Sequence, residues 1–418
     1  MADTRGTDRR NVLKGLLGLV SGGLLLQHNQ TAAQTSTGTP VDTTKVLGAA
    51  PASLGTRSPY ESIERTVAAP TPAGVSFTPL EKLSGIITPS DLHFERHHAG
   101  VPAIDPHAYE LLIHGLVERP LKFSLADLKR FPAVTRICFI ECSGNGFQAA
   151  LAPESIPQEI RAGQLDGLFS TSEWTGVKLA TLLREAGAHA SARWLLAEGQ
   201  DAAVMSRSIP MTKAWDDALV VYAQNGEALR PEQGYPARLL LPGWEGNASV
   251  KWLRRLELSD APFMTREETA KYSDAMPDGR SKMFTFLMEV KSLITTPSYG
   301  VDMSGRGWHE IRGLAWSGAG RIAGVEVSVD AGKNWHGAKL QKPVLSKCAT
   351  QFRYGWDWHG KETIIMSRAT DEAGDTQLPY AENEKGRGPR TFYHNNAIRA
   401  WKIHADGHVT FALRDMLA

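Results

Sequence analysis

The pattern of apolar and polar positions divides the chain into two parts near residue 290. In the first part, short apolar runs alternate with short segments of helical spacing. The runs at 109–115 and 218–223 predict strands, while 124–130, with a serine at its N-cap, and 179–186, followed by glycine, predict helices. The strands and helices follow no regular strand–helix–strand repeat, so we predict an α+β domain with mixed sheets over residues 80–286.

Residues 291–418 show alternation in place of helical spacing. Polar and apolar residues alternate at 325–330, a turn is predicted at 331–333, and further apolar runs follow at 363–369 and 397–403. Short alternating strands of this kind over a single domain are typical of an immunoglobulin-like sandwich. We therefore predict a second, all-β domain in this part of the chain.

Residues 1–33 have the features of an export signal. Arg9 and Arg10 precede a short apolar stretch at 15–26, and small residues follow it. The stretch is too short for a membrane-spanning helix, which needs about 20 residues, and the paired arginines fit the twin-arginine type of signal. An amphipathic N-terminal helix is the alternative. The signal predicts a periplasmic protein, and residues 34–79, rich in Thr, Ala, Ser, Pro and Gly, predict a linker or an extended arm.

The composition narrows the class of protein. The 418 residues, 42% hydrophobic and 22% charged, are enough for two or three soluble domains. Because 46 Lys and Arg balance 45 Asp and Glu, we expect neither a nucleic-acid partner nor a polybasic membrane patch. The three cysteines exclude a disulfide scaffold, and the chain lacks the Cys-x-x-Cys-His run that binds c-type haem, so we expect no haem on this chain.

Cys142 stands where a metal ligand could act. A strand-like run at 135–140 leads into the glycine-rich turn that begins at this cysteine, and a thiolate is a good ligand for a soft metal. A small buried side chain and a disulfide with Cys138 are the alternatives. Gly144 and Gly146 are not followed by a third glycine at the spacing of a dinucleotide-binding loop, which leaves that loop unsupported.

Two clusters of basic side chains are candidates for binding an anion. His93, Arg96, His97 and His98 occur together in one segment that lacks the second ligand pair of a zinc site, so an anion-binding loop and a solvated loop both remain open. Arg238 enters a hydrophobic strand and therefore needs a partner, because an unpaired buried charge is costly. That partner would be the phosphate of a cofactor or a structural carboxylate.

Over about residues 80–401, several motifs together resemble the sulfite oxidase family of molybdenum enzymes. The segment 94–98 is similar to the family's Phe-x-Arg-x-His cofactor loop, and 142–145 to its Cys-x-Gly-Asn turn. Further similar motifs are Trp-Thr-Gly-Val at 174–177, Ser-Ile-Pro at 208–210, Gly-Tyr-Pro-Ala-Arg at 234–238 and Val-Lys-Trp-Leu at 250–253. Because the motifs occur in the family's order, the resemblance is more specific than any one of them.

The resemblance implies a fold, a cofactor and a set of site residues. The fold would be an α+β molybdopterin-binding domain followed by an immunoglobulin-like β-sandwich dimerisation domain. Cys142 would be the molybdenum ligand, and with Arg96 and Tyr272 it would form the catalytic group. The molybdopterin would be held by Phe94, Arg96, His98, Asp201, Gln233, Arg238, Ser249, Val250 and Lys251, with Gln233 at a position where many relatives have a histidine.

Two departures from the family pattern bear on the substrate. Relatives usually have two arginines after the Cys-x-Gly-Asn turn, where this chain has Gly146 and Phe147, and a further family arginine is replaced by His394. Fewer fixed cations weaken the attraction for a small dianion such as sulfite. The departures suit a larger, less charged sulfur substrate on a carrier, and with the export signal they resemble the sulfane dehydrogenases of the family.

That narrower resemblance implies partners. The substrate would be sulfane sulfur bound to a sulfur-carrier protein, and the electron acceptor would be a c-type cytochrome. The chain would form a homodimer or a heterotetramer with the cytochrome. Three alternatives stay open: a sulfite:cytochrome c dehydrogenase, a methionine-sulfoxide reductase on the same scaffold, and a metal-free periplasmic binding protein of this fold.

Overall fold

The structure is a computed structural model that describes residues 48–388 and 392–413. The predicted export signal at 1–33 lies outside the described residues. Residues 48–60 belong to a unit of their own, and the chain from Glu61 onward forms the second unit. Within the described ranges, no helix has both the length and the apolar character needed to cross a membrane.

The later part of the predicted arm contains strands that the sequence pattern did not indicate. Strand β1 (Thr66–Ala69) pairs antiparallel with β2 (Val75–Phe77), and β2 pairs antiparallel with β3 (Glu95–Arg96). These strands are too short for an alternating pattern to be recognised. The short 3₁₀ helices η2 (Leu80–Lys82) and η3 (Ser90–Leu92) connect them.

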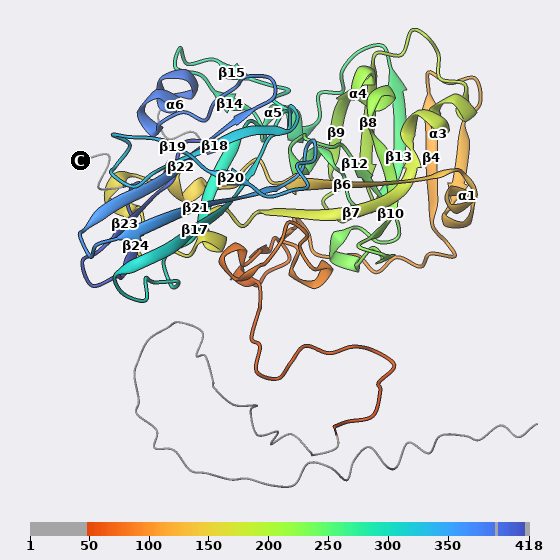
Figure 1. Cartoon of the computed structure of the whole chain (residues 1–418). Helices are drawn as coiled ribbons and strands as arrows, with labels where there is room; N and C mark the ends of the chain where they lie inside the picture. Colours follow the sequence, from red (N-terminus) through yellow and green to blue (C-terminus); the bar gives the residue numbers. More distant parts are fainter. Residues whose placement is uncertain (1–47, 389–391, 414–418) are drawn as a thin grey trace, which may run out of the picture. The chain divides into compact units, whose positions relative to one another are not determined.

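The first domain is built on two five-stranded sheets, as expected for a mixed α+β domain (Figure 1). One sheet has the order β11-β10-β7-β6 with β12 beside β10, and the other has the order β5-β4-β13-β8-β9, in which β13 and β4 are parallel. The strands are β4 (Glu110–Gly115), β5 (Leu121–Ser124), β6 (Ala133–Glu141), β7 (Phe169–Lys178), β8 (Trp194–Gly199), β9 (Ser206–Pro210), β10 (Leu219–Gln224), β11 (Glu227–Ala228), β12 (Arg238–Leu240) and β13 (Leu253–Ser259).

Short helices pack beside these sheets, and two of them confirm the sequence predictions. Helix α1 begins after Ser124, whose hydroxyl accepts from the Asp127 amide in a capping box, and α3 ends at Gly187, where φ is +69°. The helices are α1 (Leu125–Arg130), α2 (Ala162–Asp166), α3 (Leu179–Ala186), α4 (Met211–Asp216) and α5 (Arg266–Thr269), with 3₁₀ turns η4 (Phe147–Ala150), η5 (Pro153–Ser155), η6 (Pro231–Gln233) and η7 (Gly246–Ala248).

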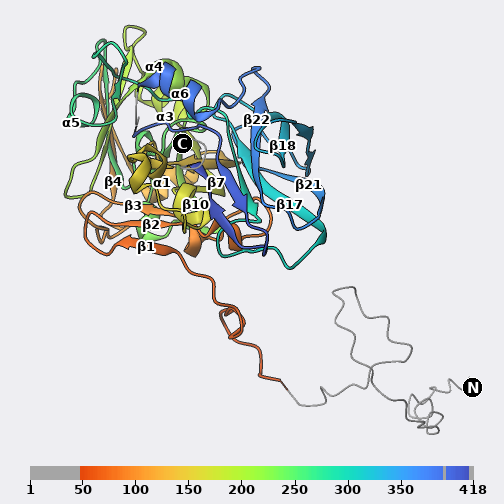
Figure 2. The ribbon, with the colours of Figure 1, turned by 90° about the vertical axis from the view of Figure 1, so that its left-hand side faces the viewer.

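The second domain is the predicted β-sandwich (Figure 2). Two antiparallel sheets, β16-β17-β21-β20 and β19-β18-β22-β23-β24, share one core that includes Ile311, Phe352, Ile365 and Trp401. A hairpin of β14 (Asp274–Ala275) and β15 (Ser281–Lys282) precedes the domain. The elements of the second domain are β16 (Lys291–Thr296), β17 (Gly307–Trp316), β18 (Ile322–Ser328), β19 (His336–Gly337), β20 (Lys339–Leu340), β21 (Thr350–Trp358), β22 (Thr363–Asp371), α6 (Tyr380–Arg387), β23 (Ala400–Ile403) and β24 (Val409–Phe411).

Candidate active site

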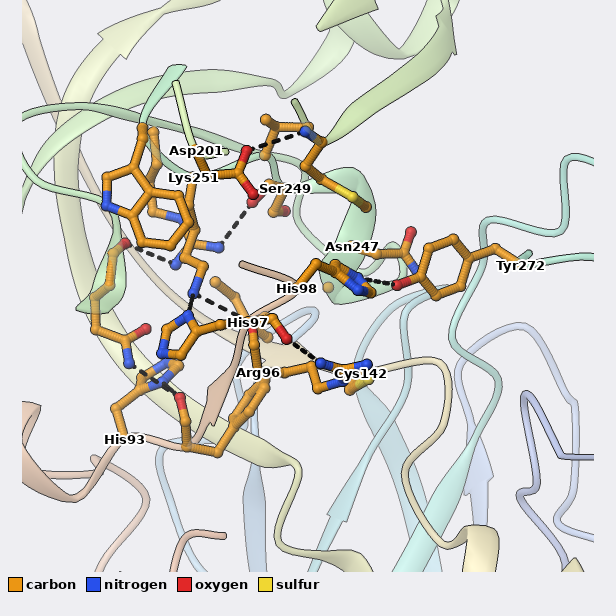
Figure 3. A pocket seen from close by; sticks show the side chains of 18 residues that line it. His93, Arg96, His97, His98, Cys142, Asp201, Asn247, Ser249, Lys251 and Tyr272 are labelled. Atoms are coloured by element: carbon orange, nitrogen blue, oxygen red, sulfur yellow. Dashed lines mark hydrogen bonds between the residues drawn. The ribbon is translucent and has the colours of Figure 1, made fainter. Parts of the chain in front are cut away.

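Side chains from widely separated segments line one cavity of about 660 Å³, a volume that includes space open to solvent (Figure 3). The structure brings every residue predicted for the site to this cavity: Phe94, Arg96, His98, Cys142, Asp201, Gln233, Arg238, Ser249, Val250, Lys251 and Tyr272. Their individual roles stay predictions, but one cavity can hold one cofactor against all of them.

Cys142 begins a tight turn at the end of β6. Its amide donates to the Leu168 carbonyl at 2.9 Å, and its carbonyl accepts from the Asn145 amide at 2.9 Å. Asn145 in turn donates to Glu141 Oε1 and accepts from the Leu168 amide, both at 2.9 Å, which fixes the turn against β7. Cys138 and Cys142 are both free thiols, so the disulfide considered from the sequence is absent from this part of the chain.

The charge around the Cys142 thiol matters for metal binding. Burial raises the pKa of this thiol, while the Gly144 amide and the positive charge of Arg96 lower it. The net effect is a raised pKa, so the thiolate needs a further positive charge close to the sulfur. A bound metal cation would supply it.

Arg238 is buried, and none of the described residues supplies a counter-ion for it. Its Nη1 donates to the Gln233 carbonyl at 3.0 Å and its Nη2 to the Ser249 carbonyl at 2.8 Å, while Nε has no hydrogen-bond partner among the described residues. Burial lowers the pKa of its guanidinium to about 9. Of the two partners considered from the sequence, a structural carboxylate is not found in the described ranges, and an anionic ligand fits the site.

Lys251 places a second, half-buried cation in the same cavity as Arg238. Its Nζ donates to His97 Nδ1 at 2.8 Å, to the Glu232 carbonyl at 2.9 Å and to the Arg96 carbonyl at 3.3 Å. Burial, reinforced by the charge of Arg238, lowers the pKa of Lys251 well below its usual value. Two cations that line one cavity, one of which lowers the pKa of the other, form a natural binding site for a phosphate group.

His98 and Tyr272 form a hydrogen-bonded pair at the cavity, with Nε2 and the phenol oxygen 2.8 Å apart. Burial and the charge of Arg96 lower the pKa of His98 to about 4, so its imidazole is neutral near pH 7. Burial raises the pKa of Tyr272, which therefore keeps its phenol proton. The guanidinium of Arg207 lies 5.3 Å from the centre of the tyrosine ring, a cation–π contact that helps to hold the ring in place.

Several cavity residues were not predicted as site residues. His93 and His97 belong to the basic cluster noted in the sequence, and Asn247 and Trp252 lie in or next to a matched motif, but no pattern distinguished them from neighbours that face elsewhere. The remaining lining residues are Ile140, Met205 and Gly246.

The structure shows what surrounds Phe147 and His394, two residues that depart from the family pattern. The ring of Phe147 stacks on that of Phe392, with ring centroids 5.7 Å apart. The ring centroids of Phe392 and Tyr393 are 5.0 Å apart, and those of Tyr393 and Tyr272 are 5.5 Å apart. An aromatic row therefore runs from the Cys142 turn to the cavity. The buried imidazole of His394 faces the Glu245 carboxylate, with Nε2 and Oε2 3.5 Å apart.

Comparison with known proteins identifies the family. A family model described as "Oxidoreductase molybdopterin binding domain" matches residues 98–267, and "Mo-co oxidoreductase dimerisation domain" matches residues 282–400. Sulfite oxidase from Gallus gallus is 33% identical over 321 residues, which are 70% of this chain and 68% of that protein. The chain belongs to the sulfite oxidase family of molybdopterin oxidoreductases. The predicted fold class is confirmed, while the predicted domain boundaries stay predictions.

Two further relatives place the chain within this family. The crystal structure of the sulfane dehydrogenase SoxCD from Paracoccus pantotrophus is 42% identical with a TM-score of 0.81, covering 86% of this chain and 95% of that chain. Nitrate reductase [NADH] from Ulva prolifera is 30% identical over 342 residues, which are 70% of this chain but 38% of that protein. The chain is thus a SoxC-like member of the family, and it spans between 38% and 68% of the length of the curated relatives named here.

The cavity fits the molybdenum cofactor that the binding domain implies. The Nε of buried Arg238 lacks a partner among the described residues, the half-buried Lys251 adds a second cation, and the Cys142 thiol needs positive charge nearby. The two cations would be neutralised by an anionic pterin phosphate, and the thiol would be matched by a metal cation. Arg238 and Lys251 would hold the phosphate, and Cys142 would hold the metal.

Proposed function

We propose that this chain is the molybdenum subunit of a periplasmic oxidoreductase that oxidises sulfane sulfur on a sulfur-carrier protein and passes the electrons to a c-type cytochrome. The observation that carries this proposal is the aromatic row from Phe147 to Tyr272, which begins at Phe147, a position where the family pattern leads us to expect arginine. Similarity to SoxCD supports it. The twin-arginine pattern at Arg9 and Arg10 supports the proposed location.

The bound cofactor supplies oxygen-atom transfer to sulfur and takes up two electrons, and the protein supplies ligation, orientation and charge. Cys142 would ligate the metal. Arg96, in β3, extends its side chain toward Cys142 and would provide positive charge for a developing oxyanion (Figure 3). Tyr272 keeps its proton and is held by His98 and Arg207, so its phenol would donate a hydrogen bond to the substrate or to a leaving oxygen.

The substrate side of the site explains the preference for carrier-bound sulfur. An aromatic row offers dispersion contacts and no net charge, so it does not concentrate a free dianion. Phe392 is about half exposed and lies against the Cys142 turn, where a protein-borne substrate arm would pass over it. Arg96 remains as the cation available for the oxidised product.

The proposal is tested by comparing substrates with the purified protein and its cytochrome partner. We expect cytochrome reduction with carrier-bound sulfane to have a much higher kcat/KM than reduction with free sulfite, and electron counting to show how many two-electron steps occur for each sulfur. Equal or better use of sulfite would contradict the proposal and favour a sulfite:cytochrome c dehydrogenase, consistent with the 33% identical sulfite oxidase. A protein purified without molybdenum would favour the metal-free binding protein.

A further inference from the structure

A chain of contacts leads from the predicted arm to Lys251 in the cavity. The Nζ of Lys251 lies 2.8 Å from His97 Nδ1, and His97 Nε2 lies 2.6 Å from Glu95 Oε2. The other oxygen of Glu95 forms an ion pair with Arg65, which comes from the segment just before β1. His97 is buried, whereas Glu95 and Arg65 are each about one-fifth exposed, so this chain of contacts runs from the protein surface through a buried histidine to the cavity.

The chemistry of the end groups fixes the direction of the hydrogen bonds. An ammonium group can only donate, so His97 Nδ1 accepts from Lys251. A neutral imidazole then carries its proton on Nε2 and donates it to the Glu95 carboxylate. Burial lowers the pKa of His97, which favours this neutral form. This chain of contacts therefore has the positive Arg65 and the negative Glu95 at its outer end and the positive Lys251 at its inner end, with a neutral His97 between them.

The same arm holds the loop from its other side. Arg65 Nη1 also donates to the His93 carbonyl at 3.1 Å, and the His97 amide donates to the Gly74 carbonyl at 3.0 Å. Strand β2 pairs with β3, so that Ser76 is opposite Glu95. The loop that carries Glu95 and His97 is thus held between the arm and the cavity.

We propose that Glu95, His97 and Arg65 are positioning residues that keep Lys251 charged and directed into the cavity, so that retention of the cofactor depends on the arm. This rests on the proposed function only in assuming that the cofactor is molybdopterin. Glu95 and His97 occupy the two variable positions of the Phe-x-Arg-x-His loop, so they are not part of the motif itself. Of the three acceptors of Lys251, the Arg96 carbonyl at 3.3 Å is the farthest and would most easily be exchanged for an oxygen of a bound anion.

The test measures molybdenum and pterin that remain with the full chain after prolonged dialysis. His97→Leu removes both hydrogen bonds, and we expect the cofactor to be lost about 10- to 100-fold faster, the effect of losing a hydrogen bond to a charged group. His97→Gln keeps one acceptor and one donor, so retention should return to near the wild-type value. Glu95→Gln keeps an acceptor but removes the charge and should give an intermediate rate of loss.

Arg65→Met tests the outer end of the chain, and Arg136→Met is its matched control. Arg136 forms a similarly exposed ion pair with Asp217, at 3.4 Å, and does not line the cavity. We expect faster cofactor loss with Arg65→Met and wild-type retention with Arg136→Met, with equal melting temperatures of the cofactor-free variants.

Wild-type retention in His97→Leu, or equal loss in His97→Gln and His97→Leu, would overturn the positioning role. Equal loss in the Arg65 and Arg136 variants would overturn the dependence on the arm. A wild-type protein without molybdenum would overturn the proposed function itself, together with this inference.

Discussion

The Nζ of Lys291 lies 2.5 Å from the Asp166 carboxylate, and this buried ion pair joins β16 of the sandwich to α2 of the first domain. Arg399 lies on the other side of Asp166, with its Nε 3.0 Å from Oδ2, and Lys291 is also 3.4 Å from Glu141 Oε1. Burial alone would raise the pKa of Asp166, but Arg399 and Lys291 hold it below its usual value. Because Glu141 directly precedes Cys142, the contact between the domains also supports the turn that begins at Cys142.

Removing one member of this cluster should destabilise the protein strongly. Lys291→Met leaves Asp166 and Glu141 buried with too little positive charge, and breaking a buried pair in this way typically costs about 3–5 kcal/mol. Lys122→Met is the control, because Lys122 pairs with Glu110 on the surface at 2.6 Å, and such pairs contribute about 0–1 kcal/mol. Urea unfolding of the two variants measures both values. Similar losses of unfolding free energy would contradict the structural role of the cluster.

Gly146 should tolerate no side chain. Its φ is +82°, and a Cβ there would lie 2.2 Å from Arg399 Nη2 and 2.7 Å from Asp166 Oδ1. Gly279 has a φ of +81° but no atom within 4 Å of its Cβ position, so Gly279→Ala carries the backbone strain alone. We expect Gly146→Ala to lower the melting temperature clearly more than Gly279→Ala. An equal shift in the two variants would show that the cluster can move aside at no cost.

The sequence predicted the fold class because each domain follows one dominant pattern. Helical spacing with a capping serine gave α1, a terminal glycine gave α3, and period-two alternation gave β18 and β22. The strands of the arm escaped prediction because they are only four and three residues long, too short to show an alternating pattern. Helix α6 was not predicted because it is largely polar and few of its residues are buried, so it shows no apolar face in the sequence.

The candidate site also has a part that the sequence predicted and a part that it did not. Motif resemblance located all the residues predicted for the site, and the structure brings them to one cavity. The hydrogen bonds of His97 and the buried cluster around Asp166 were not predictable, because they depend on which side chains meet across the fold. Even His394, noted as a departure, gave no indication that it would face Glu245.

Phe147→Arg should shift the substrate preference toward free sulfite. A cation beside the Cys142 turn would raise the local concentration of a dianion, and we expect kcat/KM for sulfite to rise about 10-fold at low ionic strength. Phe147→Leu removes the ring without adding charge and should leave sulfite turnover unchanged. The gain should decline as salt is added. A gain of the same size in both variants would mean that ring removal, and not charge, sets the preference.

His93 should make the protein sensitive to acid. Burial lowers the pKa of His93 from 6.5 to about 3, so the folded chain keeps it neutral while the unfolded chain binds a proton below pH 6.5. The unfolded state then binds more protons. As the pH is lowered from 6.5 to 3, His93 therefore reduces the free energy of unfolding by about 1.4 kcal/mol for each pH unit. His93→Asn should flatten that part of the stability profile in urea unfolding. An unchanged slope would show that His93 is protonated in the folded chain.

The central claim is that the Cys142 thiolate holds molybdenum in the cavity. It is tested most directly by molybdenum K-edge X-ray absorption on the wild type and on Cys142→Ser, which leaves the turn in place but offers a poor ligand for a soft metal. We predict molybdenum in the wild type, and one sulfur ligand fewer, with loss of turnover, in the variant. An unchanged sulfur count in Cys142→Ser, or wild-type protein without molybdenum, would contradict the account.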